Sequence, residues 1–184
     1  MSPPAGGLET KHYILAALTA TLIAAAVVTV VFIVLSPARI GFSVTEARHQ
    51  QLAGDAVKLI LTINASNPSR RAAVMYKSMD VDVSNNTGPQ WLNWISANVT
   101  TGMPLHQPTR NDRTEIKATV LLVGGPGTED FTGNMRSHAF RVKVTAVAQF
   151  KVGISWTRLY DIKVSCGPLD FFADHSSAAG CQPA

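Results

Sequence analysis

The chain has 184 residues, a formal net charge of +4 and only 15% charged residues. Its lysines and arginines are scattered along the sequence, so no basic block marks a nucleic-acid site or a polybasic lipid site. We therefore expect no nucleic acid among its partners. Without the first 35 residues about 150 remain, which is the ordinary size of one domain with a single hydrophobic core.

The first 12 residues are small and rich in Pro and Gly, and we expect them to form a flexible tail. Residues 13–35 contain no charged side chain, and thirteen of them are Leu, Ile, Val or Phe. About 20 apolar residues in a helix span the hydrocarbon core of a bilayer. The segment Tyr13–Leu35 is therefore predicted to be a single transmembrane helix that attaches the chain to a lipid bilayer.

A cleaved signal peptide is the alternative, because Ser36, Pro37 and Ala38 resemble a small-x-small cleavage site. The apolar core of a signal peptide usually has about 7 to 15 residues, and this run is longer. We therefore favour an uncleaved signal-anchor.

Three acceptor sequences for N-glycosylation follow the apolar segment, beginning at Asn64, Asn85 and Asn98. They favour a cytosolic N-terminus and a C-terminal domain on the lumenal or extracellular side. The flanking charges Lys11 and Arg39 do not decide the orientation. Unused acceptor sequences on a cytosolic domain are the alternative.

Beyond residue 36 the apolar period changes to two, which is typical of strands with one buried face. The pattern is clearest at about residues 57–64, 74–83, 115–123, 141–152 and 159–166, and a less regular strand is expected at 91–99. Asn67 and Pro68 predict a turn between the first two strands. Loops are expected at 101–111 and 124–127, and a short helical turn or cover at 129–135.

About seven strands without long helices between them predict one all-β domain over residues 36–184, folded as an antiparallel β-sandwich. From about residue 167 no periodic pattern remains, and we expect an irregular C-terminal tail.

Cys166 and Cys181 are the only cysteines of the chain. A disulfide between them would close a loop of about 15 residues and stabilise the fold by about 3 kcal/mol, in an oxidising compartment. Two unrelated thiols, with Cys166 buried in a strand, are the alternative, and the sequence does not decide between the two.

No motif announces catalysis, a cofactor or a metal site, so the chain is not expected to be an enzyme. The histidines lie far apart and show no paired metal spacing; they include His49, His106, His138 and His175. Cys166 is a weak nucleophile candidate, because it occupies an apolar strand position.

Two pairs of residues have a simple structural interpretation. Asp80 and Asp82 share one strand face, and a solvated face explains them better than a pair of catalytic carboxylates. Trp91 and Trp94 are expected to pack in the core rather than to form an exposed contact site.

Three short motifs follow the apolar segment in a particular order: the turn at Asn67 and Pro68 with Tyr76 after it, the segment 102–107, and the closing strand around Cys166. Together with the anchor they resemble the plant NDR1/HIN1-like proteins, whose extramembrane part is a late-embryogenesis-abundant type 2 (LEA-2) domain. Leu105 and His106 replace both aromatics of the family's Pro-Phe-Tyr-Gln segment, which indicates a divergent member.

The resemblance implies a sandwich similar to fibronectin III or immunoglobulin domains, tethered outside the plasma membrane. It also implies no catalysis and an association with pathogen defence and water stress. We therefore expect a membrane-anchored binding or scaffolding glycoprotein with protein partners that the sequence does not name. A structural protectant of membranes or proteins during water loss is the alternative.

Overall fold

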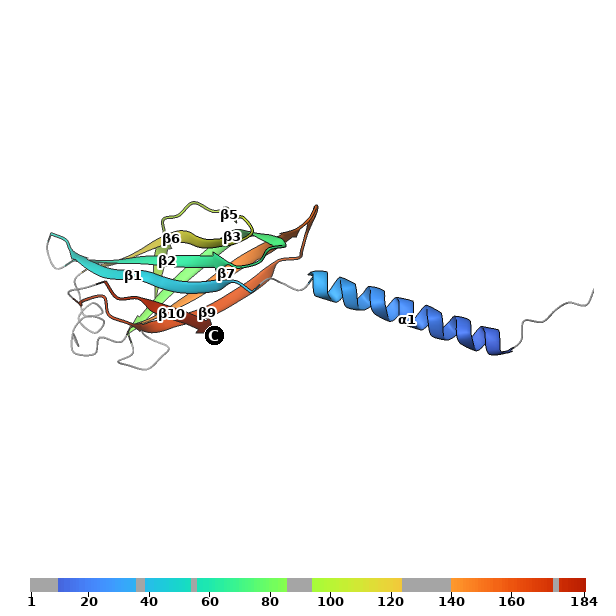
Figure 1. Ribbon diagram of the computed structural model, residues 1–184. Coiled ribbons are helices and arrows are strands. Elements are labelled where there is room, and N and C mark those ends of the chain that lie inside the picture. The colour runs from blue at the N-terminus through green and yellow to red at the C-terminus, as the bar shows by residue number, and fades with distance from the viewer. Residues whose placement is uncertain (1–9, 36–38, 54–55, 86–93, 124–139, 174–175) are drawn as a thin grey trace, which may run out of the picture. The chain divides into compact units, whose positions relative to one another are not determined.

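The structure is a computed structural model that describes residues 10–35, 39–53, 56–85, 94–123, 140–173 and 176–184 (Figure 1). The chain forms two compact units, Met1–Pro37 and Ala38–Ala184. Each unit is described by itself.

The first unit contains the helix α1 (Thr10–Leu35), so the helix predicted at residues 13–35 is confirmed. It begins three residues earlier than predicted, so residues 10–12 belong to the helix and not to the expected flexible tail, whose first nine residues lie outside the described part of the chain. Its stretch Lys11–Thr29 is long and apolar enough to cross a membrane, properties that an anchor and a signal sequence share. Thr19, Thr21 and Thr29 donate their hydroxyls to the main-chain oxygens four residues earlier. Because these hydroxyls are satisfied within the helix, they cost little in a hydrocarbon environment.

The second unit is built from strands, and ten are present in the part that the structure describes. Their bounds are β1 (Gly41–Gln51), β2 (Val57–Asn67), β3 (Ala72–Asn85), β4 (Trp94–Val99), β5 (Leu105–Gln107), β6 (Asn111–Leu122), β7 (Phe140–Val152), β8 (Ser155–Trp156), β9 (Tyr160–Leu169) and β10 (Ala179–Pro183).

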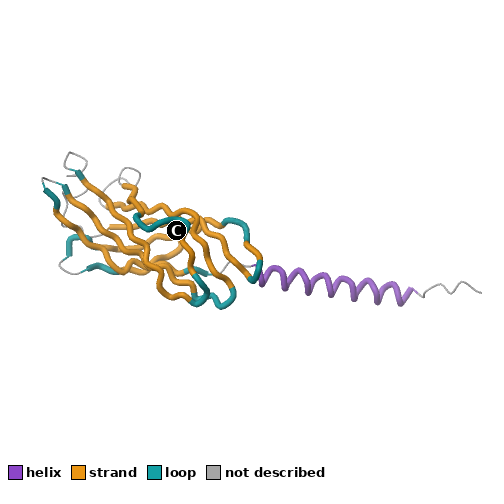
Figure 2. The backbone as a smooth tube through the Cα atoms, turned by 90° about the horizontal axis from the view of Figure 1, so that it is seen from above, coloured by secondary structure: helices purple, strands orange, loops and turns teal. Residues whose placement is uncertain are grey.

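One sheet contains all ten strands in the order β5-β3-β4-β6-β2-β1-β10-β9-β7-β8. A further antiparallel pairing joins β3 to β7 along their whole lengths, from Ala72 opposite Val152 to Asn85 opposite Phe140. This pairing connects the two sides of the sheet. The sheet therefore closes into a β-barrel, as the tube in Figure 2 shows.

The all-β class is confirmed, but the prediction of a β-sandwich is wrong, because the sheet closes on itself. Strands of a sandwich and of a small barrel alternate inward and outward side chains in the same way. Alternation alone therefore cannot distinguish the two architectures. The difference lies in the long β3–β7 pairing, which joins residues far apart in the sequence, from Asn85 with Phe140 to Ala72 with Val152.

The predicted inward faces are confirmed in β2, β6 and β7, whose alternating apolar side chains are buried in one continuous core. In β3 the alternation places Met79, Val81 and Val83 on one face, and these three side chains are buried. Val74 and Tyr76 are also buried, and a β-bulge between Tyr76 and Ser78 moves the inward positions from even to odd numbers.

Four strands were absent from the sequence prediction: β1, β5, β8 and β10. The segment 101–111, expected as loop, contains β5 and the first residue of β6. The tail expected to be irregular from about residue 167 contains the end of β9 and all of β10. β10 lacks alternation because its backbone pairs with β1 and β9 while most of its side chains stay exposed or half-buried.

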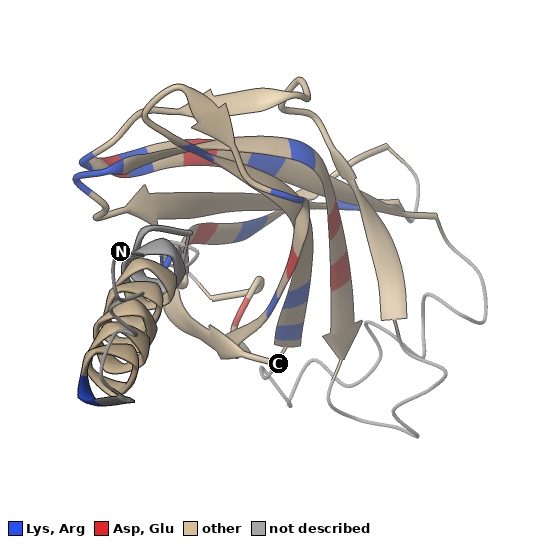
Figure 3. Cartoon of the chain, turned by 90° about the vertical axis from the view of Figure 1, so that its right-hand side faces the viewer, with Lys and Arg blue, Asp and Glu red and all other residues tan. Residues whose placement is uncertain are grey.

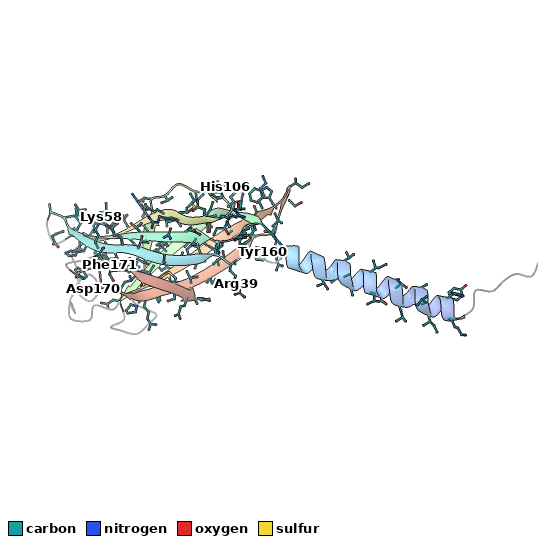
Figure 4. The ribbon with its side chains drawn as sticks, in the orientation of Figure 1. Arg39, Lys58, His106, Tyr160, Asp170 and Phe171 are labelled. Atoms are coloured by element: carbon teal, nitrogen blue, oxygen red, sulfur yellow. A yellow bond between two sulfur atoms is a disulfide. The ribbon has the colours of Figure 1, made fainter. Side chains whose placement is uncertain are left out.

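The barrel has two ends. At the proximal end the chain enters β1 at Gly41, β7 finishes and β9 begins; at the distal end β1 finishes and β7 begins at Phe140. Figure 4 labels Arg39, His106 and Tyr160 toward the proximal end and Lys58, Asp170 and Phe171 toward the distal end.

Aromatic rings close the distal end. Phe140 and Phe171 are buried and meet edge to face, with ring centroids 5.2 Å apart. His49 lies against the ring of Phe172 at 4.8 Å, and its Nδ1 is 3.0 Å from the main-chain oxygen of Phe171. Apolar contact therefore holds the residues after β9 against the core.

Candidate functional site

A buried asparagine organises the turn between β2 and β3. The side-chain amide of Asn67 donates to the main-chain oxygens of Ala72 (2.9 Å) and Pro108 (3.1 Å). Its Oδ1 accepts a hydrogen bond from the backbone N–H of Ser69 at 3.1 Å. Asn67 thus fixes the turn predicted from sequence and ties it to the segment that follows β5.

Tyr76 and Gln107 form a second buried group at the same end. The Tyr76 hydroxyl donates to Gln107 Oε1 at 2.8 Å, and Gln107 Nε2 donates to the main-chain oxygens of Ala65 (2.9 Å) and Asn111 (3.2 Å). Gln107 uses both amide hydrogens and its oxygen, which a buried amide requires. Burial raises the pKa of Tyr76, so its phenol is neutral and donates at physiological pH.

The three motifs on which the family resemblance rests are differently placed. The turn, Tyr76 and the segment ending at Gln107 lie together and close the proximal end of the barrel. The third motif, the strand around Cys166, lies in β9. Because Asn67, Tyr76 and Gln107 are buried, their geometry fits a structural role and offers no group to a substrate.

A disulfide joins Cys166 in β9 to Cys181 in β10, directly opposite it across the strand pair. The bonded sulfur leaves no thiol at the position considered for a nucleophile. Beside the disulfide lies an open groove of about 490 Å³ whose lining includes Arg141, Ser165 and Gln182. One guanidinium with a hydroxyl and an amide makes no nucleophile and base pair of the kind that catalysis uses.

The three asparagines of the acceptor sequences have different exposure. Asn98 is exposed on β4, and Thr100 of the same acceptor sequence is exposed as well. Asn64 is half-buried within β2, and its side-chain amide donates to the main-chain oxygen of Asp112 at 3.2 Å. Asn85 is buried at the end of β3. Only Asn98 presents an accessible amide in the folded barrel, and use of the sites stays a prediction.

The remaining candidates lie apart from one another. Among the described residues no group of three His, Cys, Asp or Glu side chains could hold a metal ion. Asp82 accepts a hydrogen bond from the Ser96 hydroxyl at 2.7 Å, and Asp80 is exposed on the same face. His138, His175, Trp91 and the helical turn expected at 129–135 lie outside the described residues.

Two tryptophans of the described residues are partly exposed, against the expectation that Trp94 packs in the core. Trp94 lies on β4, and Trp156 lies on β8, in a hairpin that the apolar pattern of the sequence does not predict. The hairpin's only sequence signal was Gly153 after the alternating strand, where φ is +59°. Sequence alternation could not show which apolar residues beyond that turn stay exposed.

Comparison with known proteins gives no match: no family model, no curated protein and no solved structure matches the chain.

Proposed function

We propose that the chain is a membrane-anchored, non-enzymatic binding or scaffolding protein of the NDR1/HIN1-like kind, acting in plant defence and abiotic stress signalling. The observation that carries the proposal is the pairing of one apolar helix, long enough to span a bilayer, with a separate, fully packed barrel. In this proposal α1 anchors the chain in the plasma membrane and the barrel presents its outer surface to protein partners outside the cell.

The buried polar group at the proximal end supports the family resemblance. Asn67, Tyr76 and Gln107 belong to the motifs whose order along the sequence carries the resemblance, and hydrogen bonds tie the segments that contain them to one another. A role as structural residues explains why such short motifs would characterise a domain. The barrel differs from the sandwich that the resemblance implies, so the motifs support the resemblance more than the architecture does.

The filled interior supports binding through the outer surface. The inward side chains of β2, β3, β6, β7 and β9 form one continuous core, and the groove beside Cys166 lacks a catalytic constellation. Partners would therefore meet exposed strands and turns.

Orientation can be tested through the glycosylation sites. We expect the wild-type chain, expressed in plant cells, to lose mass on glycosidase treatment, because Asn98 is exposed. Asn98→Gln should abolish the shift, whereas Asn64→Gln and Asn85→Gln serve as matched controls that retain it. The protease test uses membrane vesicles that are right side out. In these vesicles, a wild-type chain that shows no mass shift and whose barrel is degraded only after the membrane is opened would contradict an extracellular domain.

The scaffolding role can be tested by proximity labelling from the intact chain at the membrane. A reproducible set of labelled proteins that is lost when residues 38–184 are deleted would support scaffolding. If the deletion impairs desiccation tolerance but leaves both the labelled set and the pathogen response unchanged, the chain is a structural protectant instead.

A further inference from the structure

Exposed apolar side chains gather at the proximal end of the barrel. Ile154, at the tip of the β7–β8 hairpin, is 97% exposed, and Leu159 and Trp156 are 53% and 40% exposed. Turns of this kind usually carry polar residues, because water solvates them. A single exposed apolar residue needs no explanation, but a cluster marks a contact surface.

Cationic and aromatic side chains are paired within the same cluster. Lys151 Nζ lies 5.8 Å from the centre of the Trp156 ring, and the Arg158 guanidinium lies 5.2 Å from that of Tyr160. The His106 ring meets Trp156 edge to face at 6.1 Å. Aromatic rings beside basic groups are typical of protein segments at the boundary between hydrocarbon and headgroups.

Basic residues that are scattered in the sequence meet at this end. Six exposed basic residues lie at this end: Arg39 before β1, Arg70 and Arg71 in the turn after β2, Arg110 before β6, Lys151 near the end of β7, and Arg158 before β9. The acidic residues near this end, among those that the structure describes, are Asp112, Glu115 and Asp161. Figure 3 shows basic segments at turns of the barrel. The excess of positive charge favours a negatively charged partner surface.

The position of this end along the chain favours a bilayer as that surface. Only residues 36–40 separate the last residue of α1 from Gly41, and such a segment spans at most about 20 Å when fully extended. A bilayer that holds α1 is therefore within reach of the proximal end. The distal end has no such constraint.

We propose that the proximal end of the barrel docks on a phospholipid bilayer, with Ile154, Trp156 and Leu159 at the headgroup boundary and the basic residues at lipid phosphates. This inference rests on the proposed membrane anchoring. It adds a second membrane contact, which holds the barrel against the bilayer instead of leaving it free on its tether.

Fluorescence quenching in the full chain tests the docking, because Trp156 and Trp94 have nearly equal exposure, 40% and 41%, at opposite ends of the barrel. The Trp91→Phe/Trp94→Phe variant reports Trp156, and the Trp91→Phe/Trp156→Phe variant reports Trp94. Both are reconstituted in vesicles of phosphatidylcholine and phosphatidylserine that contain acyl-brominated phosphatidylcholine. We expect Trp156 to be quenched about threefold more than Trp94, because only Trp156 lies at the headgroup boundary.

A matched pair of leucines separates docking from a general effect of charge. Leu159→Asp should reduce the quenching of Trp156 to the level of Trp94. Leu121→Asp, at a residue 59% exposed on the outer face of β6, should leave it unchanged. Equal unfolding midpoints of the two variants would exclude loss of the fold as the cause. Raising the salt from 0.1 to 1 M, which shortens the screening length from about 10 to about 3 Å, should also lower the quenching.

Equal quenching of Trp156 and Trp94 in chains that float with the vesicles would overturn the docking and leave the anchor intact. Chains that fail to float would overturn the anchor, and the docking with it.

Discussion

The two ends of the barrel are closed by different chemistry. At the distal end Phe140 and Phe171 pack edge to face over an apolar core, whereas at the proximal end Asn67, Tyr76 and Gln107 bury a hydrogen-bonded group. Apolar packing tolerates a change of shape better than a buried polar group tolerates the loss of a partner, because an unsatisfied buried group costs its full desolvation. The proximal end should therefore tolerate fewer substitutions than the distal end.

Replacement of one buried residue at each end by Met should test this contrast most clearly. Gln107→Met leaves the Tyr76 hydroxyl and two main-chain oxygens without their partner and should cost about 3 kcal/mol or more. Phe171→Met keeps an apolar side chain of adaptable shape and should cost about 1.5 kcal/mol. Urea unfolding of the full chain in one detergent, followed by tryptophan fluorescence, measures both. Equal losses, or a larger loss for Phe171→Met, would contradict the contrast.

The disulfide between β9 and β10 closes neither end of the barrel. The loss of stability on removing it serves as a reference value for the two losses above. The Cys166–Cys181 disulfide has a sequence separation of 15, and its removal by Cys166→Ser/Cys181→Ser should cost about 3 kcal/mol. A reducing agent should destabilise the wild-type chain by a similar amount and leave the double variant unchanged. A wild-type unfolding midpoint that does not respond to reduction would show that β10 is held by its backbone pairing alone.

The buried tyrosine should make stability depend on alkaline pH. Burial raises the pKa of Tyr76 in the folded chain, whereas an unfolded tyrosine titrates near 10. The stabilisation that the neutral phenol contributes is fully present below pH 10 and is lost above it, at about 1.4 kcal/mol per pH unit. Unfolding measured from pH 9 to 11 should show this fall in the wild type.

Two tyrosine variants assign the pH effect. Tyr76→Phe should cost about 1 to 2 kcal/mol at neutral pH, because Gln107 loses a donor, and should flatten the alkaline fall. Tyr160→Phe, at a half-buried residue of the same end, should leave the fall in place. If stability falls with alkaline pH as steeply in Tyr76→Phe as in the wild type, groups other than Tyr76 cause the fall.

The parts of the fold that follow from local pattern were predictable. Alternation identified the inward residues of β2, β6 and β7, because each of these strands has one buried face. The bulge between Tyr76 and Ser78, the closure of the sheet through β3 and β7, and β10 depend on partners distant in the sequence. No local pattern encodes such contacts.

The candidate site shows the same division. Asn67 before Pro68 predicted the turn, because the backbone of a residue before proline is restricted to extended and turn conformations. Gln107 gave no local sign that it would accept from Tyr76, thirty-one residues earlier. The basic residues of the proximal end are scattered in the sequence and come together only because the strands return to that end. The absence of a basic block in the sequence therefore gave no sign of the lipid-binding surface that we propose.

The uncleaved anchor is tested most directly by carbonate extraction of the full chain carrying one tag at each terminus. Membrane anchoring through α1 predicts that both tags stay in the membrane pellet on a single chain of full length. Recovery of a soluble chain that has lost the N-terminal tag would identify residues 13–35 as a cleaved signal sequence and contradict the anchor.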